Sequence, residues 1–170
     1  MLISNNKSQF EALVKAYSAE LYRYAYWLCR DRFLAEDLVQ ETFARAWQSW
    51  EGLRDERAAK GWLYTILRNE RARLFERKRP IVDEAQELEE IADTASSAVF
   101  EQIELQEALE ALPQTYREPL ILQVLGGFSC TEIGKLLSVS EGAVMTRLTR
   151  ARLALRKITG AEPRRKVAQR

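Results

Sequence analysis

The sequence predicts an all-α protein of two small helical domains joined by a flexible acidic linker, with a helix-turn-helix as the C-terminal domain. Apolar residues recur at three- and four-residue intervals, which is the period of a helix, and strand signals are weak throughout. Only 7 Gly and 4 Pro interrupt the 170 residues. Residues 83–110 contain Asp and Glu but no Lys or Arg, and they separate two basic stretches. These features favour a helical unit on either side of an acidic segment.

Three helices are predicted in the first half. The stretch "SQFE" is a capping box with Ser8 as its N-cap, so the first helix is expected to begin there. A second helix is expected over about residues 34–50, with Trp47 facing inward. A third is expected over about residues 62–77, and Pro80 ends it because proline cannot continue a helix.

The acidic stretch "PIVDEAQELEEIADTASSA" is interpreted as a linker, because it has no aromatic residue and ends in small polar residues. The sequence therefore predicts a first domain over 1–82, a linker over 83–97, a second domain over 98–160 and a basic tail over 161–170. We expect the two domains to have separate cores.

The second domain carries the pattern of a helix-turn-helix. Ser129 and Glu132 form a capping box at the start of "CTEIGKLL", the turn "SVS" follows, and Ser140 caps the helix "EGAVMTRLTRARLALRK". The buried stripe of that last helix is predicted from 4, 3 and 4 spacing, and consists of Val144, Leu148, Ala151 and Leu155. Its other faces carry several Arg side chains, which can bridge guanine or hold phosphates in a major groove.

Composition argues against several classes of protein. There is no His, and Cys29 and Cys130 lie far apart outside any CxxC motif, which argues against zinc sites and disulfide frameworks. No nucleophile–base pair and no phosphate-binding Gly loop is found, so we expect no catalytic residue, no metal, no cofactor and no small-molecule substrate. No apolar run is long enough to span a membrane, and "MLISNNKSQF" lacks the plan of a signal peptide, so a cytoplasmic protein is expected.

The charge distribution points to a polyanionic partner, although the net charge is only +1. One basic stretch contains Arg57, Lys60, Arg68, Arg71, Arg73, Arg77, Lys78 and Arg79. A second runs from Arg147 to the end of the chain. Together with the helix-turn-helix, two basic patches predict two contacts with DNA.

Three motifs resemble one family, the extracytoplasmic-function group of bacterial RNA polymerase sigma factors. The stretch "LPQTYREPLILQVLGGFSCTEIGKLLSVSEGAVMTRLTRARLALRK" resembles the promoter-reading C-terminal domain of that group. "AEDLVQETFARAW" is similar to its polymerase-binding helix, and "GWLYTILRNERARLFERKR" to its helix for the minus-ten element. The resemblance covers roughly residues 8–80 and 99–158.

The resemblance implies three sets of site residues. Contact with the clamp helices of the largest polymerase subunit is expected from Asp37, Gln40, Glu41 and Phe43. Contact with the minus-ten element is expected from Trp62, Thr65, Asn69 and Arg73. Contact with the minus-thirty-five element is expected from Ala143, Met145, Thr146, Arg147, Thr149 and Arg150. For Trp62, core packing is an equally good interpretation.

The resemblance implies a sigma factor that is monomeric when free, binds core RNA polymerase, reads promoter DNA and is held inactive by an anti-sigma factor. Two rivals remain from the residues alone. One is a helical regulator that binds a palindrome as a dimer without polymerase. The other is a helical adaptor whose basic faces bind acidic proteins. Neither rival explains the polar face of "AEDLVQETF" or the pairing of Trp62 with Asn69.

Overall fold

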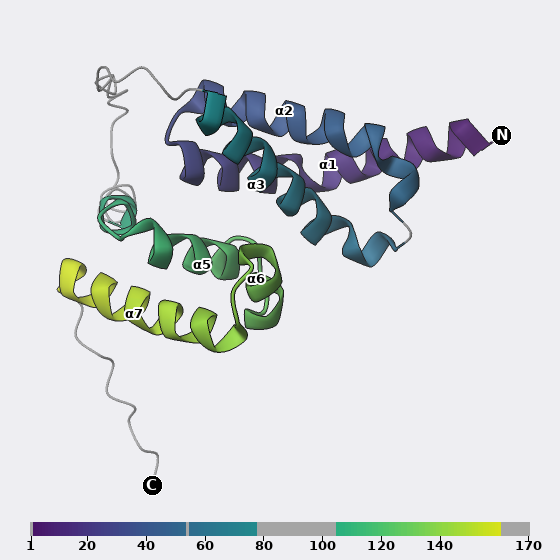
Figure 1. The fold of residues 1–170 in the computed structure, drawn as a ribbon. Coiled ribbons are helices and arrows are strands. Elements are labelled where there is room, and N and C mark those ends of the chain that lie inside the picture. Colours follow the sequence, from purple (N-terminus) through teal and green to yellow (C-terminus); the bar gives the residue numbers. More distant parts are fainter. Residues whose placement is uncertain (1, 54, 78–104, 161–170) are drawn as a thin grey trace, which may run out of the picture.

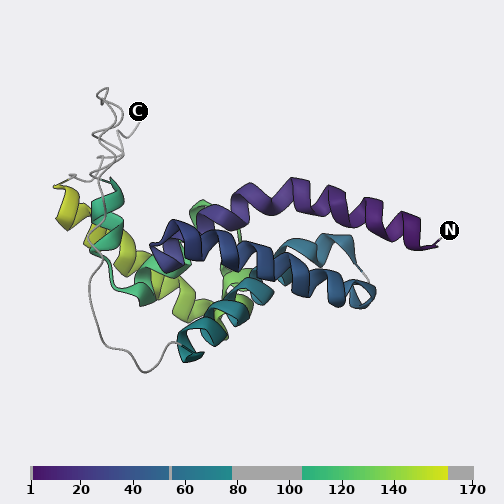
Figure 2. The same cartoon turned by 90° about the horizontal axis from the view of Figure 1, so that it is seen from above.

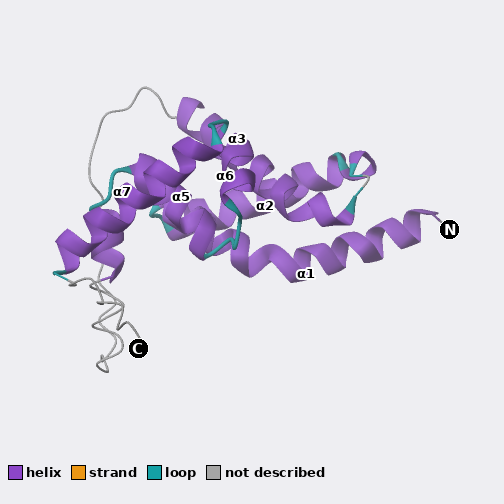
Figure 3. Ribbon diagram, turned by 90° about the horizontal axis from the view of Figure 1, so that it is seen from below, coloured by secondary structure: helices purple, strands orange, loops and turns teal. Residues whose placement is uncertain are grey.

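The computed structural model describes residues 2–53, 55–77 and 105–160, and these residues form helices joined by short loops, with no strand among them (Figure 3). The helices are α1 (Leu2–Cys29), α2 (Arg32–Gln48), α3 (Ala59–Arg77), α5 (Gln114–Val124), α6 (Cys130–Leu137) and α7 (Glu141–Thr159), with two short 3₁₀ helices, η1 (Trp50–Gly52) and η2 (Glu56–Ala58). Residues 105–110 are also helical. The all-α prediction is confirmed. The predicted linker and basic tail lie outside the described residues.

Helices α1 to α3 form one layer and α5 to α7 a second layer beside it (Figure 1). The turn between α1 and α2 is tight, because Arg30 adopts a left-handed conformation with φ of 55°. Asp31 then caps α2 by accepting a hydrogen bond from the Leu34 backbone N–H at 3.0 Å. The helix therefore begins two residues earlier than the apolar pattern predicted.

The predicted start of the first helix at Ser8 is wrong. Helix α1 already begins at Leu2, and its first turns extend past the other helices (Figure 2). The Glu11 carboxylate lies 3.9 Å from Lys7 Nζ and does not bond back to Ser8 as a capping box requires. Lys7 and Glu11 are four residues apart, which is the spacing of an ion pair within a continuous helix.

The helix-turn-helix forms as predicted. The Ser129 hydroxyl accepts from the Glu132 N–H at 3.2 Å, and the Glu132 carboxylate accepts from the Ser129 N–H at 2.8 Å. Ser140 caps α7 by accepting from the Ala143 N–H at 3.1 Å. The turn also requires Gly134, since a Cβ there would lie 2.8 Å from the Val139 carbonyl oxygen. Val144, Leu148 and Ala151 of α7 are buried, as the spacing predicted, and Leu155, the fourth member of that stripe, is half-buried.

The expectation of separate cores is wrong. Buried residues of both halves form one continuous cluster, in which the Tyr64 ring meets the Phe128 ring edge-on at 4.8 Å. Tyr24 of α1 is also fully buried, and its hydroxyl reaches Glu118 of the second layer. The apolar periodicity of the sequence did not reveal the contact between the layers, because the side chains that make it are largely Tyr, Arg, Lys and Glu. On a single helix such residues are typical of an exposed face.

Within the described ranges, no helix combines the length and the apolar character needed to cross a membrane.

Candidate nucleic-acid interfaces

The exposed side of α7 is polar. Thr146 and Thr149 are exposed, and their hydroxyls donate to the carbonyls of Gly142 and Met145 at 3.0 and 2.9 Å. A threonine hydroxyl that already donates to its own helix can only accept from a partner. In a major groove it would therefore accept from the amino group of adenine or cytosine, or pack its methyl on thymine.

The cations of α7 differ in how firmly they are held. The Arg150 guanidinium is exposed and lies 3.5 Å from the Tyr116 hydroxyl, at the outer limit of a hydrogen bond. Arg152 donates to the Gln123 side chain of α5, which ties it to the body of the domain. Arg150 is thus the more available cation for a base edge.

The other predicted residues of this set lie around the same helix. Ala143 and Arg147 are half-buried, and Met145 is 56% exposed. Met145 therefore presents an apolar surface next to the polar one.

A second face is formed by α3. Trp62, Thr65, Asn69 and Arg73 follow one another at 3, 4 and 4 residues, so they share one side of the helix. Thr65, Asn69 and Arg73 are exposed. Among the described residues, nothing hydrogen-bonds the Asn69 amide, which leaves its donor and acceptor available together.

Trp62 packs against the core, as one of its two interpretations expected, and its role toward DNA stays a prediction. The indole packs against the core and lies 6.5 Å from the Trp50 ring, yet it is only half-buried. One face is therefore supported by protein while another part remains available for stacking.

Sequence reasoning missed the buried carboxylate beneath this face. Glu70 is buried, accepts from Arg73 at 2.8 Å and lies 3.5 Å from Arg45 Nε of α2. Arg73 is consequently held on its own helix, and it must leave Glu70 to reach a phosphate. The sequence does place Arg73 three residues after Glu70, which is the spacing of an ion pair on a helix. That spacing does not show which Glu of the helix is buried.

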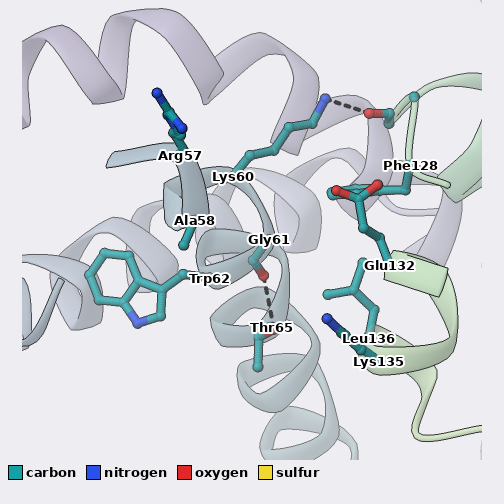
Figure 4. Close-up of a pocket in the computed structure, with 12 residues that line it drawn as sticks. Arg57, Ala58, Lys60, Gly61, Trp62, Thr65, Phe128, Glu132, Lys135 and Leu136 are labelled. Atoms are coloured by element: carbon teal, nitrogen blue, oxygen red, sulfur yellow. Dashed lines mark hydrogen bonds between the residues drawn. The ribbon is translucent and has the colours of Figure 1, made fainter. Parts of the chain in front are cut away.

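The start of α3 borders a cleft of about 430 Å³ between the two layers (Figure 4). The first layer contributes six residues between Arg57 and Thr65, and the second contributes Phe128, Glu132 and Lys135, among others. Figure 4 shows the Trp62 ring pointing away from the second layer. Hydrogen bonds from Ser129 lower the pKa of Glu132, so its carboxylate stays charged among the cations of the cleft.

The exposed face of α2 carries Asp37, Gln40 and Glu41. Glu41 accepts from Arg45 at 2.9 Å. Asp37 and Glu41 line a groove between α2 and α3 together with Arg73, so the structure brings two of the predicted residue sets side by side.

Phe43 lies elsewhere than this exposed face. Its ring is half-buried and meets Phe10 edge-on at 6.3 Å. Trp47, predicted to face inward, is 45% exposed, and Phe33 is 76% exposed. The inward prediction for Trp47 is therefore wrong, because its ring touches the Phe10 ring of α1 at 5.0 Å but nearly half of its surface stays open to solvent.

Comparison with known families gives two matches. Residues 13–81 match the family described as Sigma-70 region 2, and residues 102–155 match Sigma-70, region 4. The chain is 34% identical over 151 residues to the ECF RNA polymerase sigma factor SigL of Mycobacterium tuberculosis, with 85% of each chain covered. It is 28% identical over 172 residues to the ECF RNA polymerase sigma factor SigW of Bacillus subtilis, with 89% of each covered.

Solved structures resemble more than nine tenths of the chain, and two of them are described here. The sigma factor RpoE of Bartonella quintana, in complex with the anti-sigma factor NepR, has a TM-score of 0.67 and 27% identity, with 92% of this chain and 98% of that chain covered. CnrH in complex with the cytosolic domain of CnrY has a TM-score of 0.67 and 25% identity, with 94% and 93% covered.

Proposed function

This chain belongs to the ECF group of RNA polymerase sigma factors, which are transcription initiation factors, and we propose that it binds core RNA polymerase and directs it to promoters. The observation that carries this proposal is the pairing of an exposed helix-turn-helix face on α7 with a separate aromatic and amide face on α3. One face suits duplex DNA and the other suits an unpaired strand.

Duplex reading is assigned to α7. Arg150 would approach a guanine edge, and Thr146 and Thr149 would accept from neighbouring bases. Ala143 and Met145 at the N-terminal end would contact thymine methyl groups, and Arg147 would hold a phosphate. Together these residues would read the minus-thirty-five element.

Strand capture is assigned to α3. The Asn69 amide would bond the edge of an extruded base, Trp62 would stack, Thr65 would line the pocket and Arg73 would hold a phosphate. Contacts that exist only with unpaired bases favour the melted state, and they offset an unstacking cost of a few kcal/mol per base.

Docking on core polymerase is assigned to the outer face of α2. Asp37, Gln40 and Glu41 would orient the helix against basic residues of the clamp helices. The exposed rings of Phe33 and Trp47 add the apolar anchors that such interfaces use, and Phe43 supports the face from behind.

The proposal extends to organisation and control. Residues 1–82 and 98–160 would act as two DNA-reading domains joined by a linker at 83–97, without catalytic activity of their own. The protein would work in the cytoplasm, where polymerase transcribes. One solved structure that it resembles, that of the sigma factor RpoE, contains the anti-sigma factor NepR, which supports a partner of that kind here.

The test is transcription from a template pool with randomised upstream regions, using core polymerase with and without this protein. We expect transcripts only with both components, and sequencing of their templates should return two spaced motifs. The Asp37→Lys/Glu41→Lys double variant should lose core polymerase in gel filtration while keeping its native circular dichroism. A Glu51→Lys variant, which changes an exposed carboxylate beyond α2, is the matched control. Tight sequence-specific DNA binding by the protein alone would instead favour a stand-alone regulator.

A further inference from the structure

A carboxylate occupies a position in the core stripe of α3. The spacing of 4 and 3 residues puts Leu63, Leu67 and Glu70 on one side of the helix, and all three are buried. Burying a charge costs more free energy than burying an apolar side chain of similar size, unless the charge is well paired. An apolar residue would therefore satisfy the packing of α3 against α2 at a lower cost, and Glu70 needs an explanation beyond packing.

Glu70 belongs to a row of four charged side chains that alternate in sign. Arg73 Nη1 donates to Glu70 Oε1 at 2.8 Å, and Arg45 Nε of α2 lies 3.5 Å from the same oxygen. Arg45 Nε in turn donates to Glu41 Oε1 at 2.9 Å. We call Glu41, Arg45, Glu70 and Arg73 the charge row. It runs from the outer face of α2 to the proposed strand-contacting face of α3.

The Nε atom of Arg45 can donate to only one of its two carboxylates at a time, because it carries a single hydrogen. In this structure that hydrogen points to Glu41, and the distance to Glu70 exceeds that of a good hydrogen bond. Glu70 is therefore left to Arg73. If Glu41 is neutralised or pairs with another cation, Arg45 gains by turning to Glu70. Two guanidinium groups then share one carboxylate oxygen.

The burial of the charge row lets one end influence the other. The side chains of Glu41 and Arg73 are 49% and 53% exposed, so a partner can reach either end. Glu70, between them, is buried. Solvent screens an interaction between buried groups much less than one between exposed charges. A change in the pairing of Arg45 therefore reaches Arg73 without any movement of the helices.

A groove between α2 and α3 gives Arg73 room to move. Arg73 lines this groove of about 250 Å³ together with Glu41, Asp37 and Arg77. Asp37 offers a second carboxylate to Arg73 once Glu70 is shared, so the release of Arg73 is only partial. We therefore expect changes of a few fold in DNA affinity, which is the size that partly exposed ion pairs allow.

We propose that Arg45 is a positioning residue for Arg73, the cation through which α3 would hold a phosphate of an unpaired strand. Arg45 acts by competing for Glu70 when Glu41 is paired elsewhere, and Arg73 is then held less firmly on its own helix. This inference rests on the proposed strand capture by α3. It adds to that function a dependence on the outer face of α2, to which no DNA contact is assigned.

The first variant is Glu41→Gln, which frees Arg45 from Glu41. The affinity of the full chain for a fluorescent strand of about ten thymidines, measured by anisotropy, should rise about threefold more than in the control Glu36→Gln. The control removes an exposed carboxylate from a matched pair on the same helix, where Glu36 accepts from Arg32 at 3.3 Å. The salt dependence of binding should steepen by about 0.7 in Glu41→Gln alone, because one more phosphate contact is made.

The second variant is Arg45→Gln, which leaves Glu70 entirely to Arg73. Affinity for the same strand should fall about twofold more than in its control Arg32→Gln, which removes the cation of the matched pair. In the Arg45→Gln background, Glu41→Gln should give no excess gain in affinity, because the residue that carries the effect is missing. A purely structural role of Arg45 would lower stability without abolishing the effect of Glu41→Gln.

Equal gains from Glu41→Gln and Glu36→Gln would overturn the proposal, and so would an excess gain that survives Arg45→Gln. If the unaltered protein binds no single strand even at low salt, the strand capture assigned to α3 falls instead. Nuclear magnetic resonance of the Arg73 guanidinium still decides the inference in that case. Its rotation about the Nε–Cζ bond should quicken about threefold in Glu41→Gln and stay unchanged in Glu36→Gln. An unchanged rate in both variants would reject the role of Arg45.

Discussion

Helices α3 and α7 carry the two sets of side chains that we propose face DNA, and they hold them in different ways. On α7 the threonine hydroxyls bond only to their own helix, and Arg150 barely reaches Tyr116. On α3 the cations are engaged, Arg73 with Glu70 and Arg68 with Glu118. A duplex has one shape, so a preset face can read it. An unpaired strand exists only after opening, and the face that we propose captures it is coupled to other parts of the protein through these ion pairs.

The largest loss of stability is expected at Gly134, which packs against the turn that positions α7. Gly134→Ala should destabilise the second half by about 3 kcal/mol, because the new methyl would press on the Val139 carbonyl, which cannot move without breaking the turn. Urea unfolding would measure it. Gly142→Ala is the control, since a Cβ there meets nothing within 4 Å. Equal stability of the two variants would show that α7 is not held by this turn.

Arg150→Ala should remove a base contact in the duplex that contributes about 2 kcal/mol of binding free energy. Promoter-specific transcription should therefore fall roughly thirtyfold. Run-off transcription on a matched template would measure this. A template whose minus-ten region is already mismatched should not rescue it, because pre-melting leaves duplex reading unchanged. Rescue by the mismatched template would remove the distinction drawn between the two helices.

Asn69→Ala should cost less, about 1 kcal/mol, because one neutral amide contact to an unpaired base is lost. Here the mismatched template should restore much of the activity, since opening is no longer required. Run-off assays on the paired templates used for Arg150→Ala give the comparison directly. Equal rescue of both variants, or of neither, would mean that the roles are wrongly assigned.

The smallest effect is expected from Glu70→Gln. The amide keeps the shape of the carboxylate but loses its charge, so Arg73 is held less firmly. Stability should fall by about 0.5 kcal/mol, and binding of a random single strand of about ten nucleotides should tighten slightly as Arg73 is released. Fluorescence anisotropy would measure the binding. Glu76→Gln, on an exposed position of the same helix, is the control, and an identical response there would show that Arg73 is not restrained.

Local chemistry in the second half was predictable from the sequence, whereas the local capping signal at Ser8 was wrong and long-range contact was not predicted. The Ser129 capping box, the Ser140 cap and the Val144 stripe depend on residues within a few positions of one another, and the sequence predicted all three. The prediction that Trp47 faces inward was wrong, because an apolar residue at the edge of the apolar stripe of a helix can face either the core or the solvent.

The contact of Glu118 with Tyr24 joins residues 94 positions apart. Each belongs to a helix whose pattern is complete without the other, so no periodic signal links them. The same reason explains why the sequence predicted separate cores. The three proposed site surfaces remain predictions that the experiments above test.

Two of the contacts between the layers end on main-chain atoms, the carbonyls of Gly126 and Leu136. A carbonyl is present whatever side chain its residue bears, so point substitution in the second layer cannot delete either acceptor. Position 126 is constrained further, since a Cβ there would lie 2.6 Å from the Leu122 oxygen. Mutation can therefore adjust these two attachments only from Lys60 and Arg68. Substitutions at these two positions of α3 would change how strongly the layers associate without altering α7. The sequence of α7 could then diverge separately toward new promoter sequences.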